Sequence, residues 1–348
     1  MTKISADHQR RFNRHLILEH LLGSRLFNAL FASGKKRLQE SILEGLRGYP
    51  PGTLQPLERR TGLTAEEFRR DYFEKSRAVV LAGAARDWRC CRNWSLDRLA
   101  VEHGDQHVLL VDAEGLSGRG TRRGYEYLSL RELADNIRSG GDKYLRFSPL
   151  LQQLPVMERD IDLEWLKSLR GPRSFGNTCY MFIGGKGTRT LLHNDQPCNL
   201  YVQVSGRKKW TLYPAECAPF LDPRVSTTGY FDSPVDIDKP DLERHPLFRY
   251  IDGYEVTLEP GDVLYIPPHW WHHVENVTDT IAVACRFSSL KAALRASPTF
   301  TFLRATSMNP PIWKTMRLGR KDTNLIWAHA NGNLDEVLEE HERRSFRK

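Results

Sequence analysis

The stretch "YEVTLEPGDVLYIPPHWWHHVEN", residues 254–276, contains two strand patterns joined by a turn. The segments "YEVTL" and "DVLYIP" are rich in β-branched and aromatic residues, as strands are. Between them, "EPGD" places proline and glycine where a tight turn favours them. Similar patterns recur in "CYMFIGG", "NLYVQV", "KWTLYP" and "DTIAVACRF". These closely spaced strands predict an antiparallel barrel or a double-sheet jelly roll over residues 177–290.

The connections between these strands differ in length. The segment "VSGRK", residues 204–208, predicts a tight hairpin turn. Residues 218–250 are rich in proline and aspartate and show little periodicity. A loop of this length inside a barrel is either functional or disordered. We therefore expect residues 218–250 to supply part of the wall or the lid of a binding site.

Helical patterns flank the strands on both sides. Apolar residues recur at helical spacing near the N-terminus until "GYPPG" ends the pattern. Thr64 followed by Glu67 predicts a capping box at the start of another helix. Helices are predicted at residues 8–47, from Thr64 onward, and at residues 94–104, 129–139, 160–170 and 323–344. The protein is therefore expected to be α+β, with a mostly β jelly-roll core and helical additions at both ends.

Three regions follow from these patterns. We expect an N-terminal helical extension over residues 1–60, a catalytic domain over residues 61–290 and a C-terminal helical region over residues 291–348. The terminal helices have apolar positions that must be buried, either against the barrel or in a homodimer. The sequence leaves both arrangements open.

The composition limits the class of protein without deciding its partner. A net charge of +8 permits an acidic partner such as nucleic acid, but the basic residues are spread along the sequence, as on an ordinary solvated surface. No window approaches 18 uninterrupted apolar residues, and the N-terminus lacks the pattern of a secretory signal. The six cysteines form no CxxC pair, which argues against a zinc finger, and scattered thiols fit a reducing compartment. We expect a cytoplasmic protein without a membrane span.

A histidine and an aspartate lie two residues apart in "LLHNDQPCNLYVQVSGRKKW", residues 191–210. His193 and Asp195 project from one face of an extended strand. Burying this ionisable pair costs free energy unless a metal ion, a hydrogen bond or solvent at a strand end compensates. For a metal ion, a third ligand is expected from "PHWWHHV" on another strand. Two histidines and a carboxylate form the facial triad of non-haem Fe(II) oxygenases, which leaves three coordination positions open. A zinc ion bound by the same residues leaves fewer coordination positions open.

Strand alternation favours one histidine of this second segment. His272 shares a face with Trp270 and Val274, and this face is more apolar than that of His273. A ligand inside a barrel needs apolar surroundings, so His272 is the preferred third ligand. His269 follows two prolines and is expected at the barrel mouth, where it is a second candidate.

The combined motifs resemble the JmjC-type cupin hydroxylases. The resemblance rests on the segment from Thr190 to Asp195, on Asn199, on the turn at Gly206, on Lys208 and on "GDVLYIPPHWWHHVEN". It covers roughly residues 61–290, including "FEKSRAVVLAGAARDW", "WSLDRL" and "DKPDLERHP". Within the family, the sequence is most similar to the small hydroxylases around the asparaginyl hydroxylase that inhibits hypoxia-inducible factor.

The resemblance implies a set of site residues. His193, Asp195 and His272 are expected to hold Fe(II), in agreement with the alternation argument. Lys208 matches the lysine that binds the distal carboxylate of the cosubstrate 2-oxoglutarate, a role that suits a buried cation. Alternation alone leaves Lys209 as an alternative, because it says only that one of the two lysines points inward.

Three further residues match polar positions of the cosubstrate pocket. The resemblance implies that the hydroxyl of Thr190 contacts the distal carboxylate, that Asn199 lies in the same pocket, and that Tyr144 lies beside the cosubstrate. Each also has an ordinary structural interpretation, as a turn hydroxyl, a strand-start residue and a core residue, respectively. Trp270, Tyr201 and Phe182 are candidates for the apolar walls.

The strand "TIAVACRF" departs from the family pattern. Ala284 and Arg286 occupy the positions where close relatives carry an asparagine and an aromatic residue near the cosubstrate. An inward-pointing Arg286 is expected to supply a partner for a carboxylate or to reach the substrate.

The resemblance implies an Fe(II)- and 2-oxoglutarate-dependent dioxygenase. With O2, such an enzyme hydroxylates a C–H of a protein or peptide side chain and releases succinate and CO2. A small metabolite, a natural-product intermediate or tRNA is an alternative substrate, whereas histone demethylation is less favoured because no chromatin-reader module is visible. A non-catalytic binding cupin, or a cupin using another metal for isomerisation or ring cleavage, would have no need of an anchor at Lys208.

Overall fold

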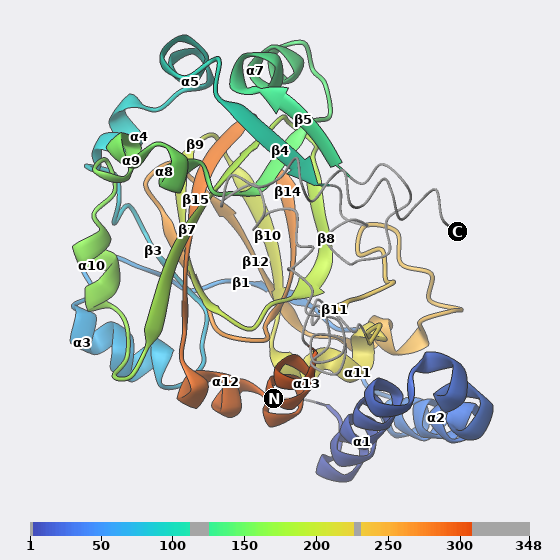
Figure 1. Cartoon of the computed structure of the whole chain (residues 1–348). Helices are drawn as coiled ribbons and strands as arrows, with labels where there is room; N and C mark the ends of the chain where they lie inside the picture. The colour runs from blue at the N-terminus through green and yellow to red at the C-terminus, as the bar shows by residue number, and fades with distance from the viewer. Residues whose placement is uncertain (1–2, 112–124, 226–230, 308–348) are drawn as a thin grey trace, which may run out of the picture.

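Two β-sheets lie face to face at the centre of the molecule, and helices surround them (Figure 1). The computed structural model describes residues 3–111, 125–225 and 231–307. In spatial order, the six-stranded sheet contains β1 (Leu54–Pro56), β12 (Gly253–Leu258), β10 (Lys208–Tyr213), β14 (Trp271–Asn276), β8 (Arg189–Asn194) and β11 (Phe231–Asp232). The seven-stranded sheet contains β2 (Arg59–Arg60), β3 (Val79–Leu81), β13 (Val263–Ile266), β9 (Cys198–Ser205), β15 (Thr280–Ser288), β7 (Phe175–Gly184) and β6 (Tyr144–Ser148). A separate hairpin pairs β4 (His107–Val111) with β5 (Tyr125–Ser129).

The order in which the polypeptide visits the two sheets makes this a jelly roll. Strands β7 and β9 belong to the seven-stranded sheet, whereas β8 and β10 belong to the six-stranded sheet. The same exchange continues from β12 to β15, because β13 and β15 return to the seven-stranded sheet. The predicted jelly-roll core is confirmed.

The predicted hairpin at residues 204–208 is wrong, although the turn itself is present. Strands β9 and β10 do not pair, because the turn carries the backbone from one sheet to the other. Gly206 has φ +71°, and a Cβ there would lie 1.8 Å from the carbonyl oxygen of Asp279. Only glycine fits this close approach without strain. Turn chemistry therefore identified the reversal but could not show which strands pair across it.

The hydrophobic residues of the strands serve two cores. Tyr201, Trp210 and Ala284 belong to the cluster that fills the space between the sheets. Leu200 and Val202, the neighbours of Tyr201, point the other way into the cluster that includes the side chains of the surrounding helices. Both faces of β9 are buried although the strand contains the polar residues Asn199 and Gln203, and its inner face helps to shape a cavity.

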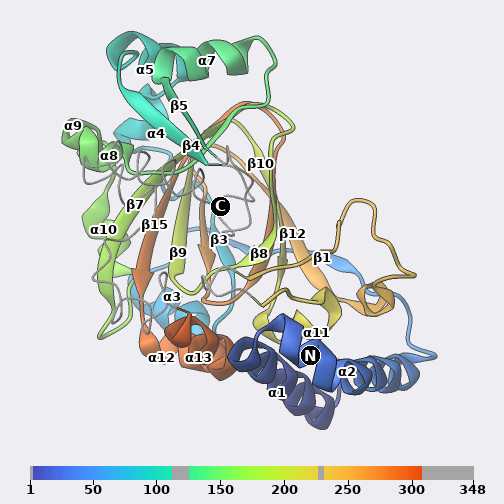
Figure 2. The same cartoon turned by 45° about the vertical axis from the view of Figure 1, so that its right-hand side comes forward.

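The N-terminal pattern forms two helices rather than the single predicted helix over residues 8–47. Helix α1 (Ala6–Leu22) ends at Gly23, whose φ of 77° breaks the helix, and α2 (Ser24–Leu46) follows directly. Figures 1 and 2 show this helical hairpin beside α11 (Ala218–Leu221) and α13 (Pro298–Thr306). Helical periodicity does not distinguish one long helix from two when a single glycine separates them.

The other predicted helices are present where the structure describes the sequence. The capping box of Thr64 and Glu67 is confirmed, with Thr64 Oγ1 accepting from Glu67 N at 3.2 Å and Glu67 Oε2 accepting from Thr64 N at 2.9 Å. The helical elements that remain are α3 (Ala65–Phe68), the π-helical turn η1 (Arg69–Phe73), α4 (Arg89–Asn93), α5 (Leu96–Glu102), α7 (Leu130–Arg138), α8 (Leu150–Gln153), α9 (Pro155–Glu158), α10 (Leu163–Ser168), the 3-10 turns η2 (Ala215–Cys217) and η3 (Pro246–Tyr250), and α12 (Leu290–Ala296). The predicted helix over residues 323–344 lies outside the described residues. No helix in the described part of the protein is long and apolar enough to cross a membrane.

The sequence suggested that all the cysteines are free thiols, but two of them form a disulfide. Cys179 on β7 and Cys285 on β15 form a disulfide between directly opposed positions, with their Cα atoms 4.2 Å apart. The two residues are 106 positions apart in the sequence, so their spacing could not reveal that antiparallel pairing makes them neighbours.

Candidate metal centre

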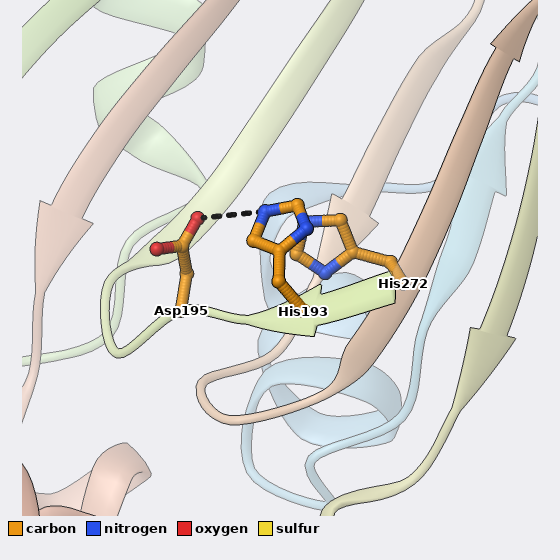
Figure 3. Close-up of side chains that lie close together, drawn as sticks. All are labelled: His193, Asp195 and His272. Atoms are coloured by element: carbon orange, nitrogen blue, oxygen red, sulfur yellow. Dashed lines mark ion pairs between the residues drawn. The ribbon is translucent and has the colours of Figure 1, made fainter. Parts of the chain in front are cut away.

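The three predicted ligands lie at one end of the cavity between the sheets. His193 is near the end of β8, Asp195 follows this strand, and His272 is on the adjacent β14, directly opposite His193 in the register. One ligand atom from each residue lies within 4.8 Å of the others. Figure 3 shows the three side chains directed toward one another. This donor set of two imidazoles and a carboxylate fits Fe(II) and leaves coordination positions open.

The two imidazole rings are held in the orientation that a metal site requires. Nδ1 of His193 lies 2.8 Å from the carbonyl oxygen of Leu191, and Nδ1 of His272 lies 3.0 Å from that of Trp270. A protonated Nδ1 donates to each carbonyl, so the lone pair of Nε2 is left for an ion. Burial lowers the pKa of His272 to about 3, and its ring is therefore neutral near physiological pH.

A β-bulge in β8 brings Thr190 to the same face as His193. The register with β14 pairs His193 with His272 but Thr190 with Val274, so β8 contains one residue more than its partner over this interval. The extra residue reverses the alternation. Strict alternation would have placed Thr190 and His193 on opposite faces, whereas both line the cavity.

Asp195 is positioned by its backbone as well as by its charge. Its carbonyl oxygen accepts a hydrogen bond from the backbone N–H of His269 at 2.7 Å, and its Oδ2 lies 3.7 Å from Nε2 of His193. Burial acts to raise the pKa of Asp195, but Arg286, His193 and His272 outweigh it and hold the pKa well below its usual range. Asp195 is therefore a carboxylate, the form that binds a metal ion.

His269, the second candidate for the third ligand, does not point into this cluster. Its Nε2 lies 3.0 Å from Oγ1 of Thr301 on α13, and its backbone adopts φ 62°. This left-handed conformation directs the ring toward the helix while its N–H holds Asp195 in place. The residue is buried against α13.

The cavity beside the three ligands is small and mainly aromatic. Its volume is about 20 Å³, which is room for about one water molecule. Thr190, Asn199 and Tyr144 all line it, so the structure brings together the three polar residues singled out by the resemblance. The apolar part of the wall consists of Phe147, Phe182, Tyr201, Trp210 and Val274.

Two sets of residues expected in the wall do not line this cavity. Trp270 does not line the cavity, because its ring stacks on Tyr254 with the ring centroids 5.9 Å apart. No described residue between 218 and 250 lines it either. In this range the structure contains α11, β11 and η3, and β11 pairs with β8 so that Asp232 lies opposite His193. The segment therefore supports the strand that carries the ligands.

Lys208, not Lys209, points into the barrel. Lys208 is fully buried, and its Nζ lies 3.1 Å from the hydroxyl of Tyr144 and 2.5 Å from that of Tyr201. Lys209 faces outward and pairs with Glu255 at 3.0 Å. Burial lowers the pKa of Lys208, and Tyr144 partly offsets this effect. Among the described residues, no carboxylate forms an ion pair with Lys208.

Arg286 points inward, and its partner is a proposed ligand. Its Nη2 donates to Oδ2 of Asp195, and its Cζ lies 5.2 Å from the ring centroid of Phe147. Ala284 is buried in the hydrophobic cluster between the sheets, opposite Tyr201. The sequence reasoning identified the position of Arg286 but not this pairing, because Asp195 is 91 residues away.

The sequence indicated Tyr201 only as an apolar wall residue and did not indicate Phe147. The hydroxyl of Tyr201 reaches Lys208, and strand alternation from Asn199 could have indicated this. Phe147 lines the cavity through a φ of 51° at an irregularity of β6. No sequence pattern signalled that conformation.

The neighbouring histidines of β14 provide a matched test of the metal centre. His272→Ala should weaken Mn(II) binding by about 100-fold or more, beyond the range seen when outer-shell partners are removed. His273→Ala should leave the dissociation constant unchanged, because its ring is on the other face of the strand. Calorimetric titration of both variants with Mn(II) measures this, and equal losses would contradict the assignment.

Comparisons with known proteins agree with this geometry. The family model for the cupin-like domain matches residues 64–292. Human HSPB1-associated protein 1 is 40% identical over 127 residues, which cover 35% of this chain and 25% of that protein. Lysine-specific demethylase JMJ30 of Arabidopsis thaliana is 28% identical over 243 residues, 68% of this chain and 56% of that protein. Lysine-specific demethylase 8 of Xenopus tropicalis is 29% identical over 228 residues, 63% of this chain and 50% of that protein.

The chain thus spans between a quarter and a little over half of the length of these relatives. The family match covers more than half of the sequence and includes every residue of the metal cluster. JmjC-type cupins are Fe(II)- and 2-oxoglutarate-dependent oxygenases that use O2. On the strength of its fold, its cluster and this match, the chain belongs to the JmjC-type cupin family.

Proposed function

We propose that this protein is an Fe(II)- and 2-oxoglutarate-dependent dioxygenase that hydroxylates a C–H bond on a side chain of a protein or peptide. The observation that carries the proposal is the fully buried cation of Lys208 in the same barrel as His193, Asp195 and His272. A buried ammonium group costs free energy unless an anion accompanies it. The distal carboxylate of 2-oxoglutarate supplies that anion, and its keto acid end chelates the metal.

The strand register supports a ligand that touches both ends of the cavity. On β10, Lys208 is four residues from Leu212, which pairs with His272. Four residues of a strand span about 13 Å, a length that a lysine side chain and a five-carbon dicarboxylate can fill together. The cosubstrate then lies along the inner face of the sheet between the metal and Lys208.

The polar residues of the cavity suit such a cosubstrate. The hydroxyls of Tyr144 and Tyr201 flank Nζ of Lys208, and both can donate to a carboxylate. Thr190 adds a third hydroxyl to the lining. Oδ1 of Asn199 is buried without a hydrogen-bond partner in the structure. This acceptor oxygen needs a donor, such as a water molecule or an N–H or O–H group of the substrate, because a carboxylate has no proton to share.

The chemistry divides between the cofactor and the protein. When bound, Fe(II) with O2 and 2-oxoglutarate inserts one oxygen atom into the substrate C–H and places the other in succinate as CO2 leaves. Phe182, Tyr201 and Trp210 exclude water from the reacting centre, and the Nδ1 hydrogen bonds fix the rings of the two histidine ligands. The cavity is too small for the cosubstrate as it stands, so side chains of the wall must move when 2-oxoglutarate enters.

The relatives support a protein substrate. One relative is named for its association with the protein HSPB1, and two are named lysine-specific demethylases. Hydroxylation of a side chain and removal of a methyl group from lysine both begin with oxidation of a C–H bond, and the same metal centre serves either reaction. The substrate class we propose is therefore a protein or peptide that presents a C–H bond of one of its residues to the metal.

The two lysines of β10 test the cosubstrate site. Lys208→Met should raise the dissociation constant of 2-oxoglutarate about 100-fold, because breaking a buried ion pair costs about 3 kcal/mol. Lys209→Met should leave it unchanged, since that residue lies on the outer face. Calorimetry of the Mn(II)-loaded variants measures both constants, and thermal melting confirms that each variant is folded. Equal affinities in the two variants would contradict the role of Lys208.

Isotope labelling tests the reaction. With 18O2, Fe(II) and 2-oxoglutarate, a peptide library treated with the wild-type protein should yield products about 18 Da heavier than the starting peptides, together with succinate. His193→Ala should yield neither. Loss of a methyl group from N-methyl-lysine peptides would instead assign the protein to demethylation, whereas succinate formation that no peptide or protein stimulates would contradict a protein substrate.

A further inference from the structure

The charges that line the metal-site cavity are few. Among the described lining residues, Arg286 is the one side chain with a fixed positive charge and Asp195 the one carboxylate. The side chain of Arg286 is 13% exposed. Its Nη2 donates to Asp195, its guanidinium group lies over the ring of Phe147, and its Nε is buried without a hydrogen-bond partner. A residue with unused donor capacity therefore stands directly beside the metal ligands.

Arg286 and a metal ion held by the three residues would draw on the same oxygen atom. The acceptor of Arg286 is Oδ2 of Asp195, which is also the oxygen 3.7 Å from Nε2 of His193 (Figure 3). This oxygen faces the imidazoles, so a metal held by the three residues draws on the same lone pairs. The negative charge available to Arg286 is then reduced.

A count of charges shows that the site would still lack one negative charge after the metal ion and 2-oxoglutarate have bound. With the metal and the cosubstrate bound, Fe(II), Lys208 and Arg286 would contribute four positive charges, whereas 2-oxoglutarate and Asp195 would contribute three negative charges. Arg286 is then a nearly buried cation whose carboxylate partner is already engaged, which costs free energy. One further anion at this end of the cavity would restore the balance.

The strand register separates this cation from the cosubstrate end. On β15, Ala284 lies opposite Tyr201, whose hydroxyl contacts Lys208, whereas Arg286 lies opposite Asn199. The two positions are two residues apart, about 7 Å along the strand, and Arg286 is on the side of Asp195. A cosubstrate that extends from Lys208 to the metal therefore leaves Arg286 available to the substrate.

We propose that Arg286 is a specificity-determining residue that binds the carboxylate of an aspartyl or glutamyl residue in the substrate. The inference rests on the proposed function and deepens it, because it names the chemical class of the substrate. The guanidinium group moves from Asp195 to the substrate carboxylate, which it binds through two parallel N–H donors. The acidic residue is thereby held beside the metal, where its own or a neighbouring C–H is presented for oxidation.

The test uses small probes and a metal that does not turn over. The protein is loaded with Mn(II) and saturated with 2-oxoglutarate in the absence of oxygen. The probes are the N-acetyl amides of aspartate and glutamate, compared with those of asparagine and glutamine. Paramagnetic broadening of the probe methylene protons in NMR spectra reports both affinity and proximity to the metal.

The acidic probes should bind the wild type about 30-fold more tightly than the amide probes, the effect of one buried charge pair. Arg286→Gln should abolish this preference, and Arg286→Lys should retain part of it. Lys209→Gln, which removes an exposed cation of the same barrel, should leave the preference intact. Because Arg286→Lys keeps the charge, it remains informative if Arg286→Gln fails to fold.

Three results would overturn the inference while leaving the proposed function intact. Equal binding of acidic and amide probes to the wild type would show that no carboxylate is selected. A preference that persists in Arg286→Gln would assign the selection to another residue. A loss of 2-oxoglutarate affinity in Arg286→Gln without any change in probe selection would assign Arg286 to the cosubstrate. If the wild type instead binds neither Mn(II) nor 2-oxoglutarate, the proposed function itself fails, and this inference fails with it.

Discussion

The pairing of β14 with β8 is the constraint on which the site depends. It places His272 directly opposite His193, two residues that are far apart in the sequence, and the bulge in β8 turns Thr190 to the same face. Because each imidazole donates from Nδ1 to a backbone carbonyl two residues earlier in the sequence, the strands that bring the ligands together also orient their rings. The third proposed ligand, Asp195, is held by the backbone N–H of His269, which belongs to the loop just before β14. A shift of one residue in this pairing would reverse the faces and disperse the cluster.

Buried charge gives the cavity its chemical character. The interior between the sheets is aromatic, yet it contains the cation of Lys208 at one end and the pair of Arg286 and Asp195 at the other. Such groups are costly in a protein interior unless ligands or partners balance them. A divalent metal and a dicarboxylate balance one part of this arrangement, and an acidic substrate would balance the remainder. The electrostatics of the cavity thus favour the binding of several ligands, namely a metal ion, a dicarboxylate and an acidic substrate, over the binding of one.

Local rules of the sequence predicted the features that depend on neighbouring residues. Alternation along an extended strand selected His272 over His273, and turn residues marked where strands end. The same rules failed where the outcome depends on distant segments or on one backbone angle. The partner of Arg286 and the disulfide of Cys179 arise from pairings between distant segments that no local pattern encodes, whereas the break at Gly23 is a local signal that helical periodicity obscured. The choice between Lys208 and Lys209 needed the register of β10, because alternation alone does not say which face is inside.

The central claim is that the three ligands and the buried lysine form one iron and cosubstrate centre. The most direct measurement is the visible absorption spectrum of the protein under anaerobic conditions, first with Fe(II) and then with 2-oxoglutarate. A charge-transfer band that forms on addition of 2-oxoglutarate to the wild type, and that does not form in His193→Ala, is the predicted result. A wild-type protein that binds one metal ion per molecule but shows no band would contradict the account.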